Sequence, residues 1–177
     1  MTATFDTTRS QERLEVQGWS ESFFQDLSHG LLHTFGYKHL TILVFDPQSN
    51  TLCRVFSTNP HIDAVGGRKR VTESYWAEQV LRHGRILRAS TREELEKLFP
   101  GSPVFSIGCA SVMNIPVRTE NATIGSLNLL GDSYQYDSAD LDVAGRFAAA
   151  CVGPLTSLLQ HVTGNLSDVS HAEIESV

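Results

Sequence analysis

Apolar residues recur every three or four positions over residues 9–35, the spacing that places them on one side of an α-helix. Gly36 follows, and a glycine just past the last apolar position often ends a helix. A second such stretch runs from Ser138, a predicted N-cap, to Leu159, with Pro154 expected to kink it. The pattern therefore predicts an amphipathic helix near each end of the chain.

Two pairs of β-rich segments lie between these helices. Leu40–Phe45 and Thr51–Ser57 flank a proline-containing turn, and Ser111–Val117 and Ala122–Leu130 flank a short polar loop. Each pair is typical of a β-hairpin. Two hairpins with terminal helices predict an α+β domain whose antiparallel sheet carries the helices on one face.

The stretch between the two hairpins is expected to cover the other face of the sheet. Thr58–Glu73 shows no sustained period, and loops of this length in compact domains are usually functional or disordered, so we interpret it as a binding loop. Ser74–His83 has helical spacing, Arg85–Arg88 suits a brief strand, and Thr91 opens a further short helix with a capping-box pattern.

Composition narrows the class of protein. The chain has 177 residues and a formal net charge of −6, which suits one domain and argues against nucleic acid as a partner. No apolar run approaches the length of a membrane span. Three separated cysteines without a Cys-x-x-Cys motif are typical of a reducing compartment, and we expect a cytoplasmic protein. We expect a flexible N-terminus at 1–8, one domain at 9–163 and a loose tail at 164–177.

Three segments carry a resemblance to a known family. They are Ser111–Val117, then Ala122–Leu130 with its Ile-Gly-x-Leu pattern, and then Asp137–Leu141 at the start of the last helix. Together they resemble the GAF domain, the small-molecule-binding module of phytochromes, phosphodiesterases and many bacterial sensors. The resemblance implies a pocket on one face of the sheet, beneath residues 58–108, which we call the roof. No output domain is recognisable, so such a sensor is expected to act through a separate protein or as a homodimer.

Three polar residues are the first candidates for binding a ligand. Asn114, Ser126 and Asn128 share one face of the second hairpin if the loop has an odd length, which would place Asn114 opposite Ser126. Small polar groups among apolar neighbours need partners. A bound ligand would provide them, and so would backbone groups or buried water.

The roof supplies the remaining candidates. Tyr75 and Trp76 suit the wall of a pocket, although Trp76 also suits ordinary core packing. Arg68 and Arg70 follow two glycines, an arrangement that favours an anionic ligand if it is not simply a solvated loop. The sequence therefore predicts a small organic ligand, with a carboxylate or phosphate as one option.

Metal and thiol chemistry have weaker support. His29 and His33 have a metal-binding spacing without a third ligand nearby, so no metal or other cofactor is predicted. Cys109 has no adjacent basic residue, and Ala110 stands where bilin-binding GAF domains have histidine, which favours an inert thiol. The catalytic cysteine of free methionine-(R)-sulfoxide reductase, a GAF-fold enzyme, would fall near Phe105 and is not matched.

Three functions remain in competition. The leading hypothesis is a ligand-binding sensor domain rather than an enzyme. The second is a small enzyme on the same fold that uses Cys109 or a histidine such as His61. The third is a dimerisation module whose terminal helices pair through apolar side chains. These side chains are Trp19, Phe23, Leu155 and Leu158.

Overall fold

A computed structural model describes residues 21–164 and 174–176 of the chain. Its first helix is α2, Glu21–Phe35. The part of the predicted helix before Glu21 lies outside the described residues, as do the predicted N-terminal segment and most of the tail. Gly36 follows α2 with a φ of +71° and donates its N–H to Leu32 O, as expected of a helix-ending glycine.

The centre of the molecule is a seven-stranded sheet in the order β4-β5-β6-β1-β2-β3-β7. Strands β4, β5, β6, β1, β2 and β3 pair with one another in antiparallel fashion, and β7 pairs with β3 in parallel. Their bounds are β1 His39–Asp46, β2 Thr51–Ser57, β3 Arg68–Arg70, β4 Leu87–Ala89, β5 Ser111–Arg118, β6 Thr123–Gly131 and β7 Ile174–Ser176. The two predicted hairpins are β1–β2 and β5–β6, and the α+β antiparallel fold is confirmed.

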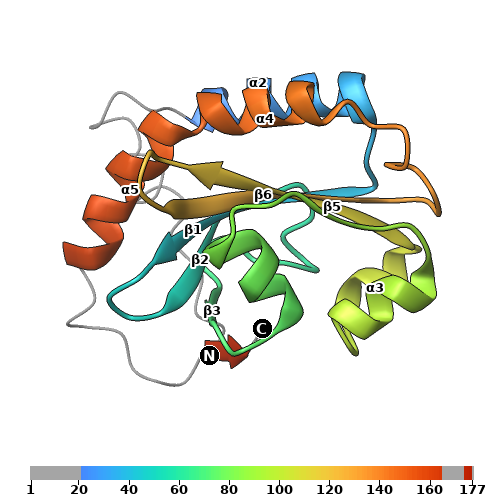
Figure 1. Ribbon diagram of the computed structural model, residues 1–177, viewed down its shortest axis with the longest axis horizontal. Helices are drawn as coiled ribbons and strands as arrows, with labels where there is room; N and C mark the ends of the chain where they lie inside the picture. The colour runs from blue at the N-terminus through green and yellow to red at the C-terminus, as the bar shows by residue number, and fades with distance from the viewer. Residues whose placement is uncertain (1–20, 165–173, 177) are drawn as a thin grey trace.

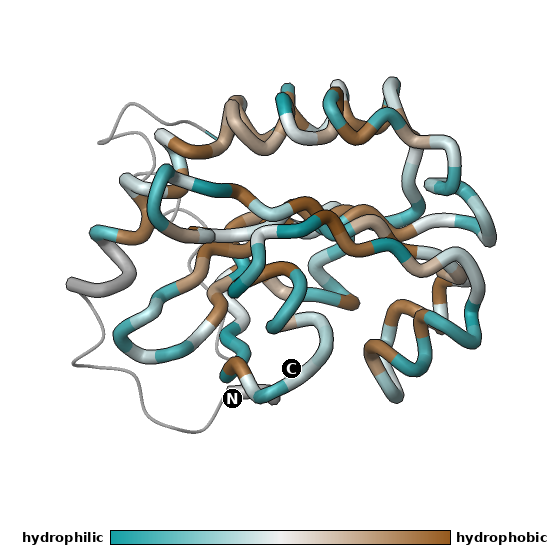
Figure 2. Tube along the Cα trace, viewed as in Figure 1, coloured by the Kyte–Doolittle hydropathy of each residue, from teal (hydrophilic) through white to brown (hydrophobic). Residues whose placement is uncertain are grey.

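Three helices belong to one face of the sheet. They are α2, α4 (Leu141–Ala150) and α5 (Val152–Gly164), and α2 and α4 run side by side above the strands (Figure 1). Polar and apolar stretches alternate along them, as expected of helices with one buried side (Figure 2). Their buried side chains join those of the central strands in the main core, which includes the fully buried Leu31, Leu127 and Leu155.

The segment between the hairpins covers the opposite face, as predicted. Its helices are the π-helix η1 (Ala77–Arg82), α3 (Arg92–Leu98) and the 3-10 helix η2 (Pro103–Ile107). Side chains of the roof pack against the sheet in two further apolar clusters. The sheet is therefore a middle layer between the terminal helices and the roof (Figure 1).

Local predictions were confirmed in part. Thr91 caps α3 by accepting the N–H of Glu94 at 3.3 Å. The prediction that Ser138 caps the last helix is wrong, because Asp140 accepts the first free N–H groups of α4. The expected kink is a break at Cys151, three residues before Pro154, which separates α4 from α5.

Candidate functional site

A row of buried polar side chains crosses four strands of the sheet. Asn114 on β5 pairs with Asn128 on β6, which pairs with Thr41 on β1, which pairs with Ser57 on β2. Directly paired residues of antiparallel strands project to the same side. We call these four residues the polar row; all are at most 9% exposed. The residue beside Asn114 on β4 is Leu87, which packs with roof residues, so the row faces the roof.

Hydrogen bonds connect the row internally. Asn114 Nδ2 donates to Asn128 Oδ1 at 2.7 Å, and Ser126 Oγ donates to the same oxygen at 3.1 Å. Asn128 Nδ2 donates in turn to Thr41 Oγ1 at 3.3 Å. Asn114 Oδ1 is buried and has no hydrogen-bond partner among the described residues. The row thus satisfies Asn128 and leaves one acceptor of Asn114 open.

The three predicted strand residues therefore lie together on the roof-facing side, but in a different register from the one expected. Asn114 stands opposite Asn128, and Ser126 stands opposite Pro116. The hairpin register shifts at Val117/Arg118, where the pairing is irregular, and the position of such a shift is not visible in the strand pattern. The shared face was still predicted because a two-residue slip preserves the side to which each residue projects.

The two predicted aromatic residues have different environments. Trp76 is 3% exposed and packs in one apolar cluster with Leu43, Leu52 and Leu87 of the sheet. Its indole Nε1 is buried without a partner in the described part of the chain. Tyr75 is 60% exposed, which does not suit the wall of a pocket. Among the described residues, Trp76 Nε1 of the roof is therefore a buried donor without a partner, and Asn114 Oδ1 of the sheet is a buried acceptor without a partner.

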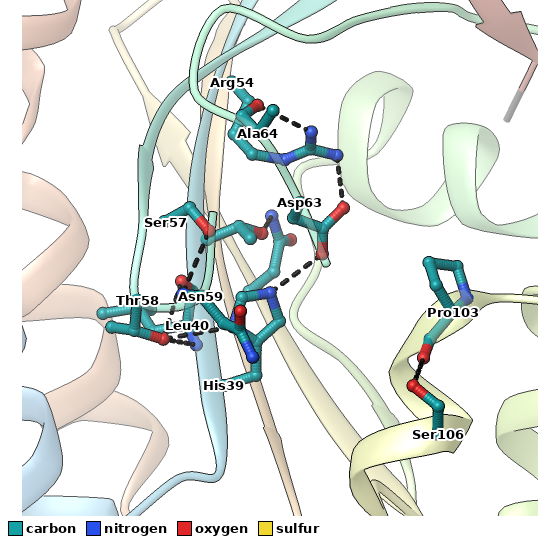
Figure 3. Close-up of polar contacts among 12 residues, drawn as sticks. His39, Leu40, Arg54, Ser57, Thr58, Asn59, Asp63, Ala64, Pro103 and Ser106 are labelled. Atoms are coloured by element: carbon teal, nitrogen blue, oxygen red, sulfur yellow. Dashed lines mark hydrogen bonds and ion pairs between the residues drawn. The ribbon is translucent and has the colours of Figure 1, made fainter. Parts of the chain in front are cut away.

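A charged network ties the loop after β2 to the sheet (Figure 3). His39, which is fully buried, places its Nε2 2.8 Å from Asp63 Oδ2. The other oxygen of Asp63 lies 2.7 Å from Arg54 Nη2, and Arg54 Nη1 donates to Ala64 O at 3.0 Å. Sequence reasoning did not identify this network, because its members are far apart in the chain and follow no motif.

Asp63 is held in its charged form by this network. Burial raises the pKa of Asp63, but the hydrogen bond from His39 and the positive charge of Arg54 lower it more, so the pKa lies below its ordinary value. Asp63 and Arg54 thus remain an ion pair at neutral pH.

The same loop differs from the anion-binding loop that was predicted. Gly66 donates its N–H to Arg54 O, and Gly67 donates to Ala64 O, so neither amide is free to hold an anion. The loop ends in β3, where Arg68 pairs with Cys53. Cys53 belongs to the core beneath the terminal helices, so Arg68 lies on the face opposite the polar row, and Arg70, two residues on, shares that face.

Cys109 lacks the environment of a reactive thiol. Its side chain is fully buried, and burial raises its pKa to about 11, against the smaller lowering effect of Lys38. His61, the other proposed reactive group, is exposed, as are His29 and His33. The described residues hold no group of three or more metal-ligating side chains. The ligand roles predicted for residues of the strands and the roof stay predictions.

Two pockets lie at the rim of the roof. One of about 270 Å³ is lined by Phe45, residues 71–73 and η1, and the other, of about 260 Å³, extends toward the turn of hairpin β5–β6. They share Phe45, Leu81 and Arg82. Neither of these two pockets is lined by the polar row.

Comparison with known proteins settles the family. The sequence model of the GAF domain matches residues 20–152, three quarters of the chain. The chain belongs to the GAF domain family. No curated protein matches this GAF domain.

In the described residues, no helix has both the length and the apolar character that a membrane crossing demands.

Solved structures share the fold of this GAF domain at low sequence identity. The GAF domain of an Acinetobacter phosphoenolpyruvate-protein phosphotransferase is 16% identical, with a TM-score of 0.60 over 94% of this chain and 99% of that one. The GAF domain of a two-component sensor histidine kinase from Bacillus halodurans is 12% identical, with a TM-score of 0.61 over 82% and 97%. Type II free methionine-R-sulfoxide reductase from Thermoplasma acidophilum is 14% identical, with a TM-score of 0.61 over 77% and 91%.

Proposed function

We propose that this GAF domain is a regulatory module that binds a small organic ligand between the roof and the polar row. The proposal rests on two of the buried polar atoms that have no hydrogen-bond partner among the described residues, Asn114 Oδ1 and Trp76 Nε1. A buried polar group without a partner costs about 1–3 kcal/mol, and native structures retain few of them. A ligand that donates to Asn114 and accepts from Trp76 would remove both costs.

The charge of the site favours a neutral ligand. The polar row consists of amides and hydroxyls, and the nearby Asp63 and Arg54 neutralise each other. The anionic ligand that the sequence suggested depends on Arg68 and Arg70, which belong to the other face of the sheet. We therefore propose a neutral ligand with both a donor and an acceptor, such as an amide, a lactam or a nucleobase.

Signalling would pass from the polar row to the last helix. Leu155 of α5 is fully buried in the core, and a Cβ added at Gly125 of β6 would lie 2.7 Å from its Cδ1. Strand β6 also carries Asn128 and Ser126, so a shift of this strand on ligand binding would move the contact with α5. We propose that α5 transmits the change to a separate protein or to a second copy of the domain.

The dimerisation proposal needs a different set of contacts from the predicted one. Leu155 is buried in the core and Trp19 lies outside the described residues. Phe23 and Leu158 are half-buried, and Leu32 on α2 is 46% exposed. A dimer through the terminal helices would use these last three side chains. Light scattering of wild type and Leu32→Glu tests it; a wild type that remains monomeric rejects the dimer.

The experiment for ligand binding combines native mass spectrometry of the purified protein with a thermal-shift screen of small amides, lactams, nucleobases and matched carboxylates. A compound that binds at the polar row raises the melting temperature of the wild type and of Asn121→Val, an exposed turn variant. It has no effect on Asn114→Val, which lacks the acceptor. A screen in which no neutral compound binds, or in which every stabilising neutral compound shifts Asn114→Val as much as the wild type, rejects the proposal.

A further inference from the structure

The pocket of about 260 Å³ is lined by residues from the turn of hairpin β5–β6, from η1 and from α5. Its apolar lining comes from Phe45 of β1, Leu81 of η1, Ile124 of β6 and Leu159 of α5. No member of the polar row lines it. The pocket is therefore distinct from the polar row.

The charged side chains of this pocket are all positive. Arg82 and Arg118 line it, and none of its lining residues is acidic. Arg82 has only a distant pairing, with Nη2 3.9 Å from Glu73 Oε1, and both side chains are largely exposed, at 65% and 94%. An ion pair of this kind contributes little, so Arg82 remains available to a stronger anionic partner.

Arg118 is positioned by the Thr123 side chain and by the backbone of Gly84. Its Nη1 donates to Thr123 Oγ1 at 3.3 Å, which leaves further N–H donors of the guanidinium for a ligand. Gly84, just after η1, has a φ of +60°, and a Cβ at this glycine would overlap the guanidinium of Arg118. The glycine turn thus lets the arginine lie against the end of the roof helix.

We propose that this pocket binds a small amphipathic carboxylate. The carboxylate would lie between Arg82 and Arg118, because guanidinium groups bind carboxylates through two parallel hydrogen bonds. The apolar part would pack against Phe45, Leu81 and Leu159. The pocket is slightly smaller than typical ligand sites of about 300–1,000 Å³, which limits the ligand to a short chain.

The test is isothermal titration calorimetry of the full chain with sodium hexanoate, hexanamide and sodium acetate. Hexanoate is expected to bind about tenfold more tightly than hexanamide, which lacks the charge, or acetate, which lacks the chain. Equal affinity for hexanoate and hexanamide, or no heat of binding with millimolar hexanoate, overturns the proposal.

Variants locate the binding site. Arg82→Gln and Arg118→Gln are each expected to weaken hexanoate binding about tenfold, whereas Arg146→Gln, on an exposed position of α4, leaves it unchanged. The Arg82 side chain is 65% exposed, so Arg82→Gln is expected to fold normally. This variant therefore tests the site even if Arg118→Gln fails to fold. Equal weakening by Arg146→Gln would show binding by general charge and overturn the proposal. Asn114→Val is expected to bind hexanoate normally, so this site and the polar row can fail independently.

Discussion

Replacing Asn114 with valine is expected to stabilise the ligand-free protein even though the change removes a hydrogen bond. The buried Oδ1 of Asn114 has no partner among the described residues, which costs about 1–3 kcal/mol, and the bond from its Nδ2 to Asn128 contributes about 1 kcal/mol. Asn128 Oδ1 keeps the hydroxyl donor of Ser126 after the change. Valine is also favoured in strands. The net expectation is a gain of about 1 kcal/mol in the free energy of unfolding.

The neighbouring residue provides the matched control. Asn128 is also buried and belongs to the same row, but its side chain bonds to Asn114, Ser126 and Thr41. Asn128→Val would leave polar groups of these neighbours without partners and is expected to destabilise the protein by about 2–4 kcal/mol. Two identical substitutions at paired positions are therefore expected to have opposite effects.

Urea unfolding and thermal melting measure both variants. For a chain of this size, 1 kcal/mol corresponds to a shift of about 2–4 °C, so Asn114→Val should melt higher by this amount and Asn128→Val lower by more. If Asn114→Val is destabilised by 1 kcal/mol or more, Asn114 Oδ1 has a partner in solution, for example ordered water. That result would refute the reasoning from the unpaired acceptor.

Three further predictions concern stability and reactivity. Asp63→Asn leaves Arg54 and His39 without their carboxylate and is expected to cost about 3 kcal/mol at pH 7 in urea unfolding. The pKa of Asp63 in the folded protein lies below its ordinary value, so the wild type loses the stabilisation from this carboxylate as the pH falls from about 4 through the lowered pKa. The variant is therefore expected to lose less stability in acid. Equal dependence of stability on pH in both proteins would contradict this. Cys109, with a pKa of about 11, is expected to resist iodoacetamide in the native protein at pH 7.5 and to react after unfolding, as mass spectrometry would show. Gly125→Ala places a Cβ against the backbone of β1 and is expected to lower the free energy of unfolding by about 3 kcal/mol. An unchanged melting temperature would show that β1 and β6 accommodate the Cβ without loss of stability.

Local patterns were sufficient for the elements of the fold. The β-rich segments on either side of each hairpin turn, Gly36 after the first helix and Thr91 at the start of α3 are local signals, and the elements that each of them predicted were confirmed. The cap of α4 was missed because Ser138 and Asp140 both suit an N-cap, and the choice depends on where the chain leaves the sheet. Strand β3 was missed because Arg68–Arg70 has no apolar side and is a strand only through its pairing with β2 and β7.

By itself the sequence determined the α+β class and the two hairpins, and it predicted a shared face for Asn114, Ser126 and Asn128 on the condition of an odd loop length, because side-chain periodicity is a property of the local backbone. Only the tertiary structure decided which polar groups have partners. The register of β5 on β6 satisfies Asn128 and leaves Asn114 Oδ1 open, and the fold brings Asp63 to His39 across 24 residues. Hydrogen bonding and burial depend on atoms from distant segments, and the candidate sites follow from those contacts.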